Sequence, residues 1–130
     1  MVGIVIVSHS SKIAQGVVEL SQQMAQGDVK ILSAGGTEDG SIGTDATKIM
    51  EAIIEADSGN GVLVMVDLGS AIMSTEMAID LIDEKKRDMI KIADAPIVEG
   101  SISAVVQASI GETLDKVKSA AEESKDFSKM

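Results

Sequence analysis

The chain has no cysteine, tryptophan or tyrosine, and it has only one phenylalanine, one proline and one histidine among its 130 residues. Without cysteine it forms no disulfide, uses no thiol nucleophile and holds no iron–sulfur cluster or thiolate-bound zinc. A single histidine excludes any site that needs two imidazoles. The lack of aromatic side chains removes the platforms on which nucleic-acid bases stack. The core of this protein must therefore be aliphatic.

Cations are also scarce, since 11 Lys and Arg face 21 Asp and Glu, giving a net charge of −10 at pH 7. Such a surface is repelled by phosphate backbones and anionic lipid, so we expect no nucleic-acid or membrane partner. No apolar run approaches the roughly 18 residues of a membrane-spanning helix. The first cation, Lys12, follows the apolar N-terminal run, whereas a secretory signal has the opposite order. We therefore expect a cytoplasmic protein.

Short apolar runs alternate with amphipathic stretches along the chain. Runs rich in β-branched residues predict four buried strands, at residues 2–7, 29–33, 62–66 and 89–93. Apolar residues recur at helical spacing between and after these runs. The alternation predicts an α/β fold with an open, mainly parallel four-stranded sheet of order 2-1-3-4 and helices on both faces. The length fits one domain, which we expect over residues 1–123, with a frayed tail at 124–130.

Local signals predict where several helices begin and end. Gly27 predicts the end of the first helix, Asp45 the N-cap of the second and Pro96 the first turn of the fourth. Gly100 is a weak point within that fourth helix. We expect methionines to fill the core in place of aromatic side chains, at positions Met50, Met65, Met73 and Met77.

Two polar residues follow the first and third predicted strands, namely His9 and Asp67. In open parallel sheets, ligands bind at the carboxyl ends of the strands where the strand order reverses, which here lies between these two strands. A neutral imidazole is a nucleophile near pH 7, and a carboxylate that accepts its Nδ1–H leaves Nε2 free to attack. The competing interpretations are a structural histidine and an aspartate that only caps a helix. The convergence favours His9 as a phosphoryl acceptor and Asp67 as the group that orients it.

Small and hydroxyl-bearing residues lie next to His9 and Asp67 in the sequence. The helix that follows His9 would present free N–H groups to a phosphoryl group, and Ser70 can cap a helix or donate to phosphate oxygens. A glycine-rich segment at 35–44 is either a flexible loop or a rim over His9, and it lacks the Lys-Ser/Thr of a P-loop. No metal site is expected. The residues expected to cradle a phosphoryl group or to form the rim are Ser10, Ser11, Gly35, Gly36, Gly69 and Ser70.

Two segments, residues 4–10 and 64–71, resemble the mannose-type IIA domain of the bacterial sugar phosphotransferase system. The resemblance extends to about residue 123. Within that family, Asp67-Leu68-Gly69-Ser70-Ala71 and the loop at residues 34–44 are most similar to the DhaM group, the phosphocarrier subunits of phosphoenolpyruvate-dependent dihydroxyacetone kinase.

This resemblance implies a relay of phosphoryl groups. His9 would take a phosphoryl group from phospho-HPr, which is charged from phosphoenolpyruvate through enzyme I. It would pass the group to ADP on the DhaL subunit, and the resulting ATP would phosphorylate dihydroxyacetone on DhaK. The resemblance also implies a homodimer, with no tightly bound cofactor apart from the transient phosphoryl group. Because the chain is acidic, we expect both partners to present Arg or Lys around their docking surfaces.

Three other functions share parts of this pattern. A sugar-transport IIA domain would use the same chemistry but pass its phosphoryl group to a IIB partner. A response-regulator receiver domain also has an Asp after its third strand, but it needs an acidic pair where this chain has Ser8-His9-Ser10. A tetrapyrrole metal chelatase would need a second metal ligand such as another histidine.

Overall fold

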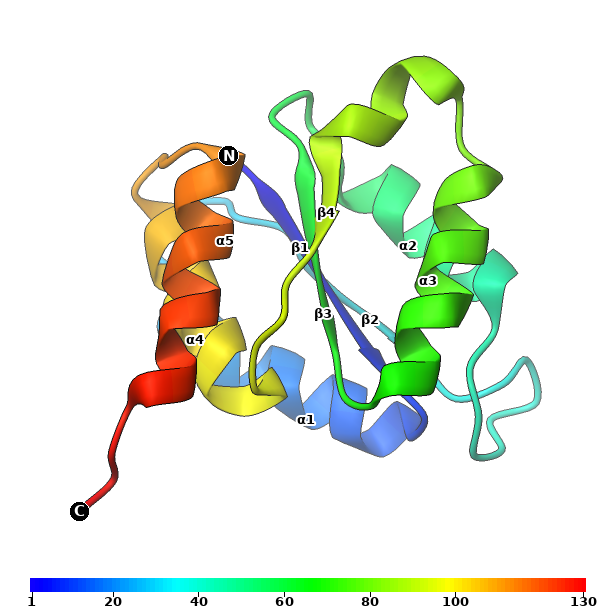
Figure 1. The fold of residues 1–130 in the computed structure, drawn as a ribbon, viewed down its shortest axis with the longest axis horizontal. Coiled ribbons are helices and arrows are strands. Elements are labelled where there is room, and N and C mark those ends of the chain that lie inside the picture. The colour runs from blue at the N-terminus through cyan, green and yellow to red at the C-terminus, as the bar shows by residue number, and fades with distance from the viewer.

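Four parallel strands form one sheet in the computed structural model, which describes residues 1–130 (Figure 1). They are β1 (Gly3–Ser8), β2 (Ile31–Gly35), β3 (Val62–Val66) and β4 (Ile90–Ile92). Their order in the sheet is β2-β1-β3-β4, as predicted. The sequence placed β2 two residues too early and β4 one residue too long at each end, because short apolar runs do not fix where pairing with a neighbour starts.

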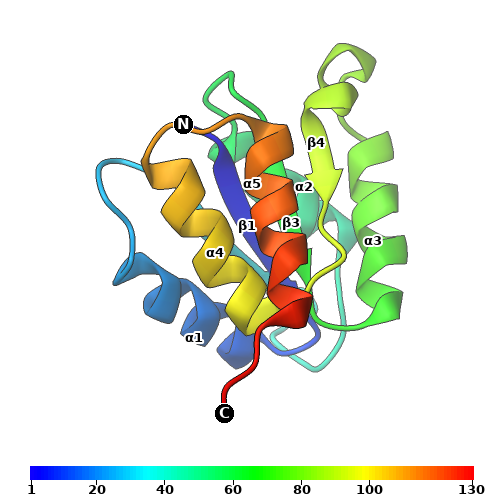
Figure 2. The ribbon, with the colours of Figure 1, turned by 60° about the vertical axis from the view of Figure 1, so that its left-hand side comes forward.

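Five helices cover both faces of the sheet: α1 (Ser11–Gln22), α2 (Ala46–Ala56), α3 (Gly69–Asp80), α4 (Ile97–Ser109) and α5 (Leu114–Glu123). Figures 1 and 2 show α1, α4 and α5 on one face and α2 and α3 on the other. Two short 3₁₀ turns, η1 (Glu84–Met89) and η2 (Ser124–Asp126), precede β4 and follow α5. None of these helices combines the length and apolarity needed to cross a lipid bilayer.

The sheet separates two aliphatic cores, because alternate residues of each buried strand point to opposite faces. Ile4 and Ile6 of β1 pack with α1, α4 and α5, whereas Val5 and Val7 pack with α2 and α3. Neither core contains an aromatic residue, and the single phenylalanine, Phe127, is exposed. The prediction of an aliphatic core is therefore confirmed.

Two of the four methionines predicted in the core lie outside it. Met65 is fully buried and Met50 is half-buried, but Met73 and Met77 are 69% and 61% exposed. The prediction was wrong because helical spacing defines a face without saying whether that face points inward. On α3 the buried face carries small residues instead, Ala71, Thr75 and Ala78, which let the helix lie close to the sheet.

Of the three predicted helix boundaries, one holds, one is displaced by one residue and one is wrong. Asp45 caps α2 by accepting hydrogen bonds from two backbone N–H groups of the first turn, and Pro96 immediately precedes α4. In contrast, α1 ends at Gln22, and Gly27, with φ +73°, lies in the following loop. After Gln22 the chain leaves the α-helical pattern in two tighter turns, in which the N–H groups of Met24 and Ala25 donate to the carbonyls of Ser21 and Gln22.

Gly100 lies in the unbroken interior of α4 rather than at a break. A Cβ atom at this position would lie 2.8 Å from Met65 Cε and 2.9 Å from Ala95 Cβ. The glycine therefore lets α4 approach the sheet closely, and this contact offsets its low helix propensity. After α5, η2 continues the chain and buries Ser124, whose hydroxyl donates to the carbonyl of Ala121.

Candidate phosphoryl-transfer site

The reversal of strand order brings His9 and Asp67 together. β1 pairs with β2 on one side and with β3 on the other, with Val7 opposite Val66. One residue separates His9 from Val7, and Asp67 directly follows Val66. Both polar residues therefore emerge at the same edge of the sheet, where the buried strands end.

Asp67 holds both the backbone and the ring of His9. The imidazole Nδ1 lies 3.0 Å from Asp67 Oδ1, and the backbone N–H of His9 donates to Asp67 Oδ2 at 3.0 Å. The His9 side chain remains 22% exposed, while that of Asp67 is 13% exposed. The carboxylate is thus the inner member of the pair and the imidazole the outer one.

All four lone-pair positions of the Asp67 carboxylate are occupied. Oδ2 also accepts from the Ser8 hydroxyl at 2.9 Å, and Oδ1 also accepts from the Leu68 N–H at 2.7 Å. Partial burial raises the pKa of Asp67, but the hydrogen bonds from His9, Ser8 and Leu68 outweigh burial, so the pKa lies below its ordinary value of 3.8. Asp67 is therefore ionised at neutral pH and can only accept hydrogen bonds.

An ionised Asp67 fixes the tautomer of His9. Because the carboxylate only accepts, Nδ1 carries the proton and Nε2 keeps its lone pair. Ser70 Oγ lies 2.7 Å from Nε2, so its hydroxyl donates to that lone pair. Ser70 does not cap α3 as predicted: the N-cap is Leu68, without a side-chain hydrogen bond. An incoming phosphoryl group would have to displace this hydroxyl, which would then be placed to donate to a phosphoryl oxygen.

Two helices begin beside His9. The Ser10 side chain caps α1 by accepting from the Ile13 N–H at 3.2 Å, and α3 begins at Gly69. The first backbone N–H groups of an α-helix, here those of Ser11 and Lys12 in α1 and of Gly69 and Ser70 in α3, have no acceptor within their own helix. The positive ends of two helix dipoles and these N–H groups together favour an anionic phosphoryl group.

Gly35, the last residue of β2, and Gly36 lie where the chain passes from the sheet into the loop at residues 36–45. A Cβ atom on Gly35 would lie 2.7 Å from the carbonyl oxygen of Ser10 and 2.8 Å from Ser11 Cα. Gly35 thus allows the first turn of α1 to pack directly on the end of β2. Gly36 has φ +76°, and its N–H donates to the carbonyl of Ser8 at 3.1 Å.

We predict that Gly35→Ala destabilises the protein by about 1–3 kcal/mol, because the added methyl group overlaps backbone atoms that cannot move aside. Urea denaturation measures the effect. Gly16→Ala is the matched control, since no atom beyond the backbone of α1 itself lies within 4 Å of its Cβ position, and alanine should stabilise that helix by about 0.5–1 kcal/mol. Equal behaviour of the two variants would contradict the packing argument.

The loop at residues 36–45 is fixed as a rim beside His9. The Gly43 N–H donates to the carbonyl of His9 at 2.8 Å, and the Thr44 and Ser74 hydroxyls lie 2.5 Å apart, which joins the loop to α3. Hydrogen bonds from the Thr37 hydroxyl and from Ser41 lower the pKa of the exposed Asp39 to about 2. Of the two interpretations left open by the sequence, this geometry favours the rim.

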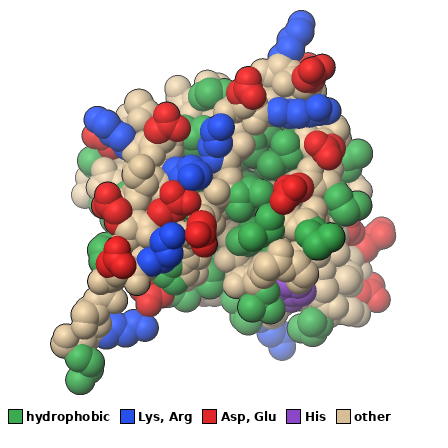
Figure 3. Space-filling view, in the orientation of Figure 1, with side chains coloured by type: hydrophobic (Ala, Val, Ile, Leu, Met, Phe, Trp, Pro, Cys, Tyr) green, Lys and Arg blue, Asp and Glu red, His purple; other side chains and the backbone are tan.

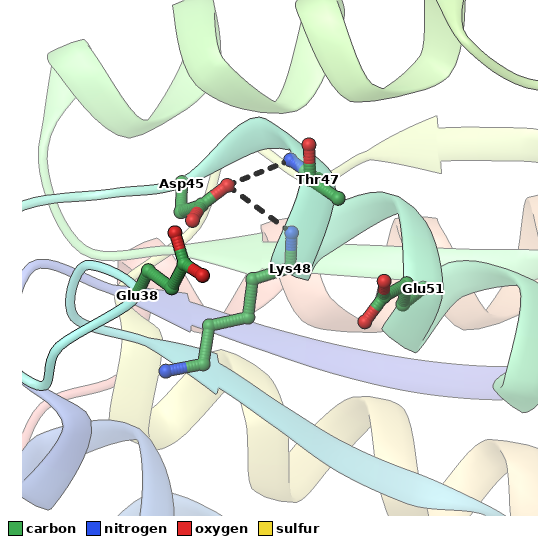
Figure 4. A pocket seen from close by; sticks show the side chains of 5 residues that line it. All are labelled: Glu38, Asp45, Thr47, Lys48 and Glu51. Atoms are coloured by element: carbon green, nitrogen blue, oxygen red, sulfur yellow. Dashed lines mark hydrogen bonds between the residues drawn. The ribbon is translucent and has the colours of Figure 1, made fainter.

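Lys48 anchors the start of this loop. Its Nζ donates to the carbonyl of Gly35 at 2.8 Å and reaches that of Thr37 at 3.5 Å. Figure 4 shows the Lys48 side chain extending from α2 along a pocket that Glu38, Asp45, Thr47 and Glu51 also line. Although three carboxylates line this pocket, the ammonium group forms no ion pair and binds only main-chain carbonyls. Lys48 thus acts as a clamp between α2 and the end of β2.

We predict that Lys48→Met, which keeps the aliphatic length but removes the ammonium group, loosens the rim. Hydrogen exchange at the Gly43 amide should accelerate, and phosphoryl transfer at His9 should slow by about threefold to tenfold, because the rim supports the His9 backbone. Lys30→Met is the control, since Lys30 donates to the carbonyl of Glu55 away from this loop. An unchanged Gly43 exchange rate in the Lys48 variant would refute the clamp.

The sequence interpretation missed two residues that hold the site in place, Ser8 and Lys48. Ser8 is completely buried, donates to Asp67 and accepts from the Ser10 N–H at 3.0 Å. The sequence did contain a signal for Ser8, because it is a polar residue at the end of an otherwise apolar strand. Lys48 gave no signal, because a lysine in an amphipathic helix normally faces solvent, and only the tertiary structure places its ammonium group on β2.

The lowered pKa of Asp67 predicts a pH-dependent contribution to stability. Because the carboxyl pKa is lower in the folded than in the unfolded chain, ionised Asp67 stabilises the folded state at pH values above the ordinary pKa of 3.8. This stabilisation is lost as the pH falls through the lower pKa of the folded state. The difference in urea midpoint between the wild type and Asp67→Asn should therefore be largest at pH 7 and shrink as pH falls below about 4. A difference that stays constant down to pH 2 would contradict this assignment.

Comparison with known proteins identifies relatives over nearly the whole chain. The family model EIIA-man, described as "PTS system fructose IIA component", matches residues 3–118. The phosphoryl donor subunit DhaM of the PEP-dependent dihydroxyacetone kinase of Escherichia coli is 46% identical over 120 residues, which cover 90% of this chain and 25% of that protein. The chain thus spans about a quarter of the length of this relative.

Shorter relatives match from end to end. A DhaM subunit of PEP-dependent dihydroxyacetone kinase 2 from Listeria innocua is 38% identical, with 90% of this chain and 94% of that protein covered. The crystal structure of a protein of unknown function has a TM-score of 0.83 at 37% identity and covers 95% of both chains. An EIIA component from Streptococcus agalactiae shares the fold, with a TM-score of 0.68 at 18% identity, covering 95% of this chain and 92% of that one. The chain therefore belongs to the EIIA-man family of phosphotransferase-system IIA components and groups within it with the DhaM phosphoryl donor subunits.

Proposed function

We propose that this protein is a phosphohistidine carrier that takes a phosphoryl group from phospho-HPr onto His9 and passes it to ADP bound on a DhaL subunit. The ATP formed there would phosphorylate dihydroxyacetone on DhaK. The chain would thus be the phosphocarrier subunit of a phosphoenolpyruvate–glycerone phosphotransferase. Similarity to DhaM subunits over 90% of the chain supports this assignment.

One observation carries the chemistry: His9 Nδ1 is held by an ionised carboxylate while Nε2 faces outward beside a hydroxyl donor. In the first step the Nε2 lone pair attacks the phosphorus of the donor phosphohistidine. The donor N–P bond breaks as the Nε2–P bond forms, and the electron pair of the broken bond returns to the donor imidazole. The proton on Nδ1 stays in its hydrogen bond with Asp67, which stabilises the positive charge on the ring.

In the second step, a terminal β-phosphate oxygen of ADP attacks the phosphorus on Nε2. The Nε2–P bond breaks, its electron pair returns to Nε2, and ATP forms. Because the N–P bond is high in energy, the protein only has to position the group and balance its charge. The Ser70 hydroxyl and the N–H groups that begin α1 and α3 supply that balance.

The remaining parts of the proposal concern the form of the protein. We assign it to the cytoplasm, where ADP is available, with no cofactor other than the transient phosphoryl group. The folded unit would be a single IIA domain over residues 1–123, and η2 packs its first residue, Ser124, against the end of this domain. We also propose a homodimer: β2 and β4 each pair with one neighbour only, and an edge strand of this kind can pair with a second chain.

Incubation with radiolabelled phosphoenolpyruvate, enzyme I and HPr tests the first step. We expect label on the protein that is lost in acid and retained in alkali, as for phosphohistidine. Addition of DhaL with ADP should then discharge the label into ATP within the assay. Alkali-labile label on Asp67 would instead support a receiver domain, and discharge only by a sugar-specific IIB protein would move the assignment to sugar transport.

A further inference from the structure

The chain contains a single asparagine, Asn60, and a glycine follows it directly. This pair ends the turn between α2 and β3, which Figure 1 shows at the upper end of the sheet. Figure 3, in the same orientation, shows the single histidine near the lower edge. Asn60 is exposed, whereas Gly61 is buried. The peptide bond between them thus lies where a surface turn enters the sheet, at the end of β3 away from His9.

No hydrogen bond restrains the two groups of this pair that can react with each other. The turn is held by the Gly59 N–H, which donates to Asp57 Oδ1 at 2.9 Å. Neither the side-chain amide of Asn60 nor the backbone N–H of Gly61 has a hydrogen-bond partner. Asn60 also borders a pocket of about 290 Å³, so water has access to its amide group.

An asparagine followed by glycine can lose its amide group without an enzyme. The Gly61 nitrogen, after losing its proton to a base, attacks Cγ of Asn60, because glycine has no side chain to block the approach. The new N–Cγ bond closes a succinimide ring. The Cγ–Nδ2 bond breaks, and the nitrogen leaves as ammonia with the electron pair of that bond and a proton that replaces the one lost from Gly61.

Water then opens the succinimide ring at one of its two carbonyl carbons. Opening at Cγ breaks the N–Cγ bond and gives aspartate in an unchanged backbone. Opening at the main-chain carbonyl carbon breaks the original peptide bond and gives isoaspartate, whose backbone runs through Cβ and Cγ. Both products carry a new carboxylate, but only isoaspartate lengthens the main chain, by one methylene group.

Asp39 and Gly40 form a pair with the same chemistry in the rim loop, and there the hydrogen bonds oppose it. The Gly40 N–H donates to the carbonyl of Thr37 at 3.0 Å, which holds the nitrogen away from attack. The Asp39 carboxylate accepts from the Thr37 hydroxyl and the Ser41 N–H, and these bonds lower its pKa to about 2. Ring closure at aspartate needs the neutral carboxyl group, which is scarce at neutral pH. The structure therefore protects this pair and leaves Asn60 unprotected.

An isoaspartate at position 60 would lengthen the main chain directly before β3. The Gly61 carbonyl accepts from the Gly3 N–H at 3.0 Å, and this bond begins the pairing of β1 with β3. Gly61 has little room to move, because a Cβ atom there would lie 2.8 Å from the Met89 carbonyl oxygen and 3.0 Å from Leu114 Cδ2. The added methylene group must therefore distort the turn or weaken the first hydrogen bond of the central strand pair.

We propose that Asn60 is a site of spontaneous deamidation, and that its isoaspartate product destabilises the sheet. This inference goes beyond the proposed function and does not depend on it. The isoaspartyl carboxylate is the group that an isoaspartate methyltransferase recognises and methylates with S-adenosylmethionine. Molecules of this protein would thus age at the amino end of β3, while the groups of the phosphoryl-transfer site at its other end stay chemically intact.

The test follows the full folded chain during incubation in warm, mildly alkaline buffer. Ion exchange separates the more acidic products, peptide mapping locates the modified residue, and methylation by an isoaspartate methyltransferase distinguishes isoaspartate from aspartate. Asn60 should react within about threefold of its rate in the urea-unfolded chain, because the turn does not protect it. Asp39 should isomerise at least about tenfold more slowly in the folded than in the unfolded chain, because its hydrogen bonds exist only in the folded state.

Two variants serve as controls. Asn60→Gln keeps the amide group on a side chain too long to close the succinimide ring, so no acidic product should form at residue 60. Asn60→Asp carries the added charge without the longer backbone, and the purified isoaspartate form should unfold at a lower urea midpoint than this variant. Equal midpoints would overturn the effect assigned to the sheet. The site itself is overturned if Asn60 reacts more than about tenfold more slowly in the folded chain than in urea, or no faster than Asp39 in the folded chain.

Discussion

Replacing His9 with alanine is expected to abolish labelling from phosphoenolpyruvate, with a loss of more than about a thousandfold. In the mechanism that we propose, Nε2 is the atom that forms the N–P bond, and the chain has no other histidine to take its place. The measurement is retained radiolabel after gel filtration of the protein incubated with enzyme I, HPr and phosphoenolpyruvate.

The fold should survive this change, because the His9 side chain lies at the surface edge of the site and packs in neither core. The urea midpoint of His9→Ala should therefore stay close to that of the wild type. His9→Gln, which keeps a polar side chain near Asp67, serves as a second variant. A folded His9→Ala protein that still accepts label would end the assignment of His9 as phosphoryl acceptor.

Replacing Asp67 with asparagine should slow phosphoryl transfer by about 10²–10⁴-fold, as isosteric loss of the carboxylate does in an Asp–His pair. Asparagine can present an N–H group to the ring, which favours the tautomer with its proton on Nε2 and removes the nucleophilic lone pair. The rate of transfer from phospho-HPr measures the effect, and ¹⁵N chemical shifts of His9 report the tautomer directly.

The same variant should lose about 1–3 kcal/mol of stability, because the side chain no longer offers acceptors to all four donors that now converge on it. Asp45→Asn is the matched control: it is also isosteric, it keeps the N-cap of α2, and it should leave transfer unchanged. If Asp67→Asn unfolds the chain but the residual folded fraction transfers phosphoryl at the wild-type rate, Asp67 has a structural role only.

The hydrogen bonds of Asp67 also separate this protein from a receiver domain. A receiver uses the Asp after its third strand as the phosphoryl acceptor, which requires a carboxylate oxygen open to attack. Here each oxygen already accepts two hydrogen bonds, and the side chain is only 13% exposed. The more exposed of the two side chains is the imidazole, whose Nε2 accepts only the Ser70 hydroxyl.

The sequence alone determined the order of the elements and the place of the site. Buried strands read as continuous β-branched runs, and right-handed crossovers leave few arrangements, so the sheet order could be predicted. That order places the ends of β1 and β3 side by side, which brings His9 and Asp67 within hydrogen-bond distance. These inferences depend on local periodicity and chain topology, both of which a single sequence contains.

Only the tertiary structure decided which helix faces point inward and which side chains complete the site. The apolar stripe of α3 that includes Met73 faces solvent. The opposite face of this helix, which carries small residues, packs closely on the sheet. Likewise, Ser70 contacts Nε2 instead of capping its helix, and Lys48 clamps a loop. Such choices depend on distances between elements far apart in the chain, and helical or strand periodicity carries no information about those distances.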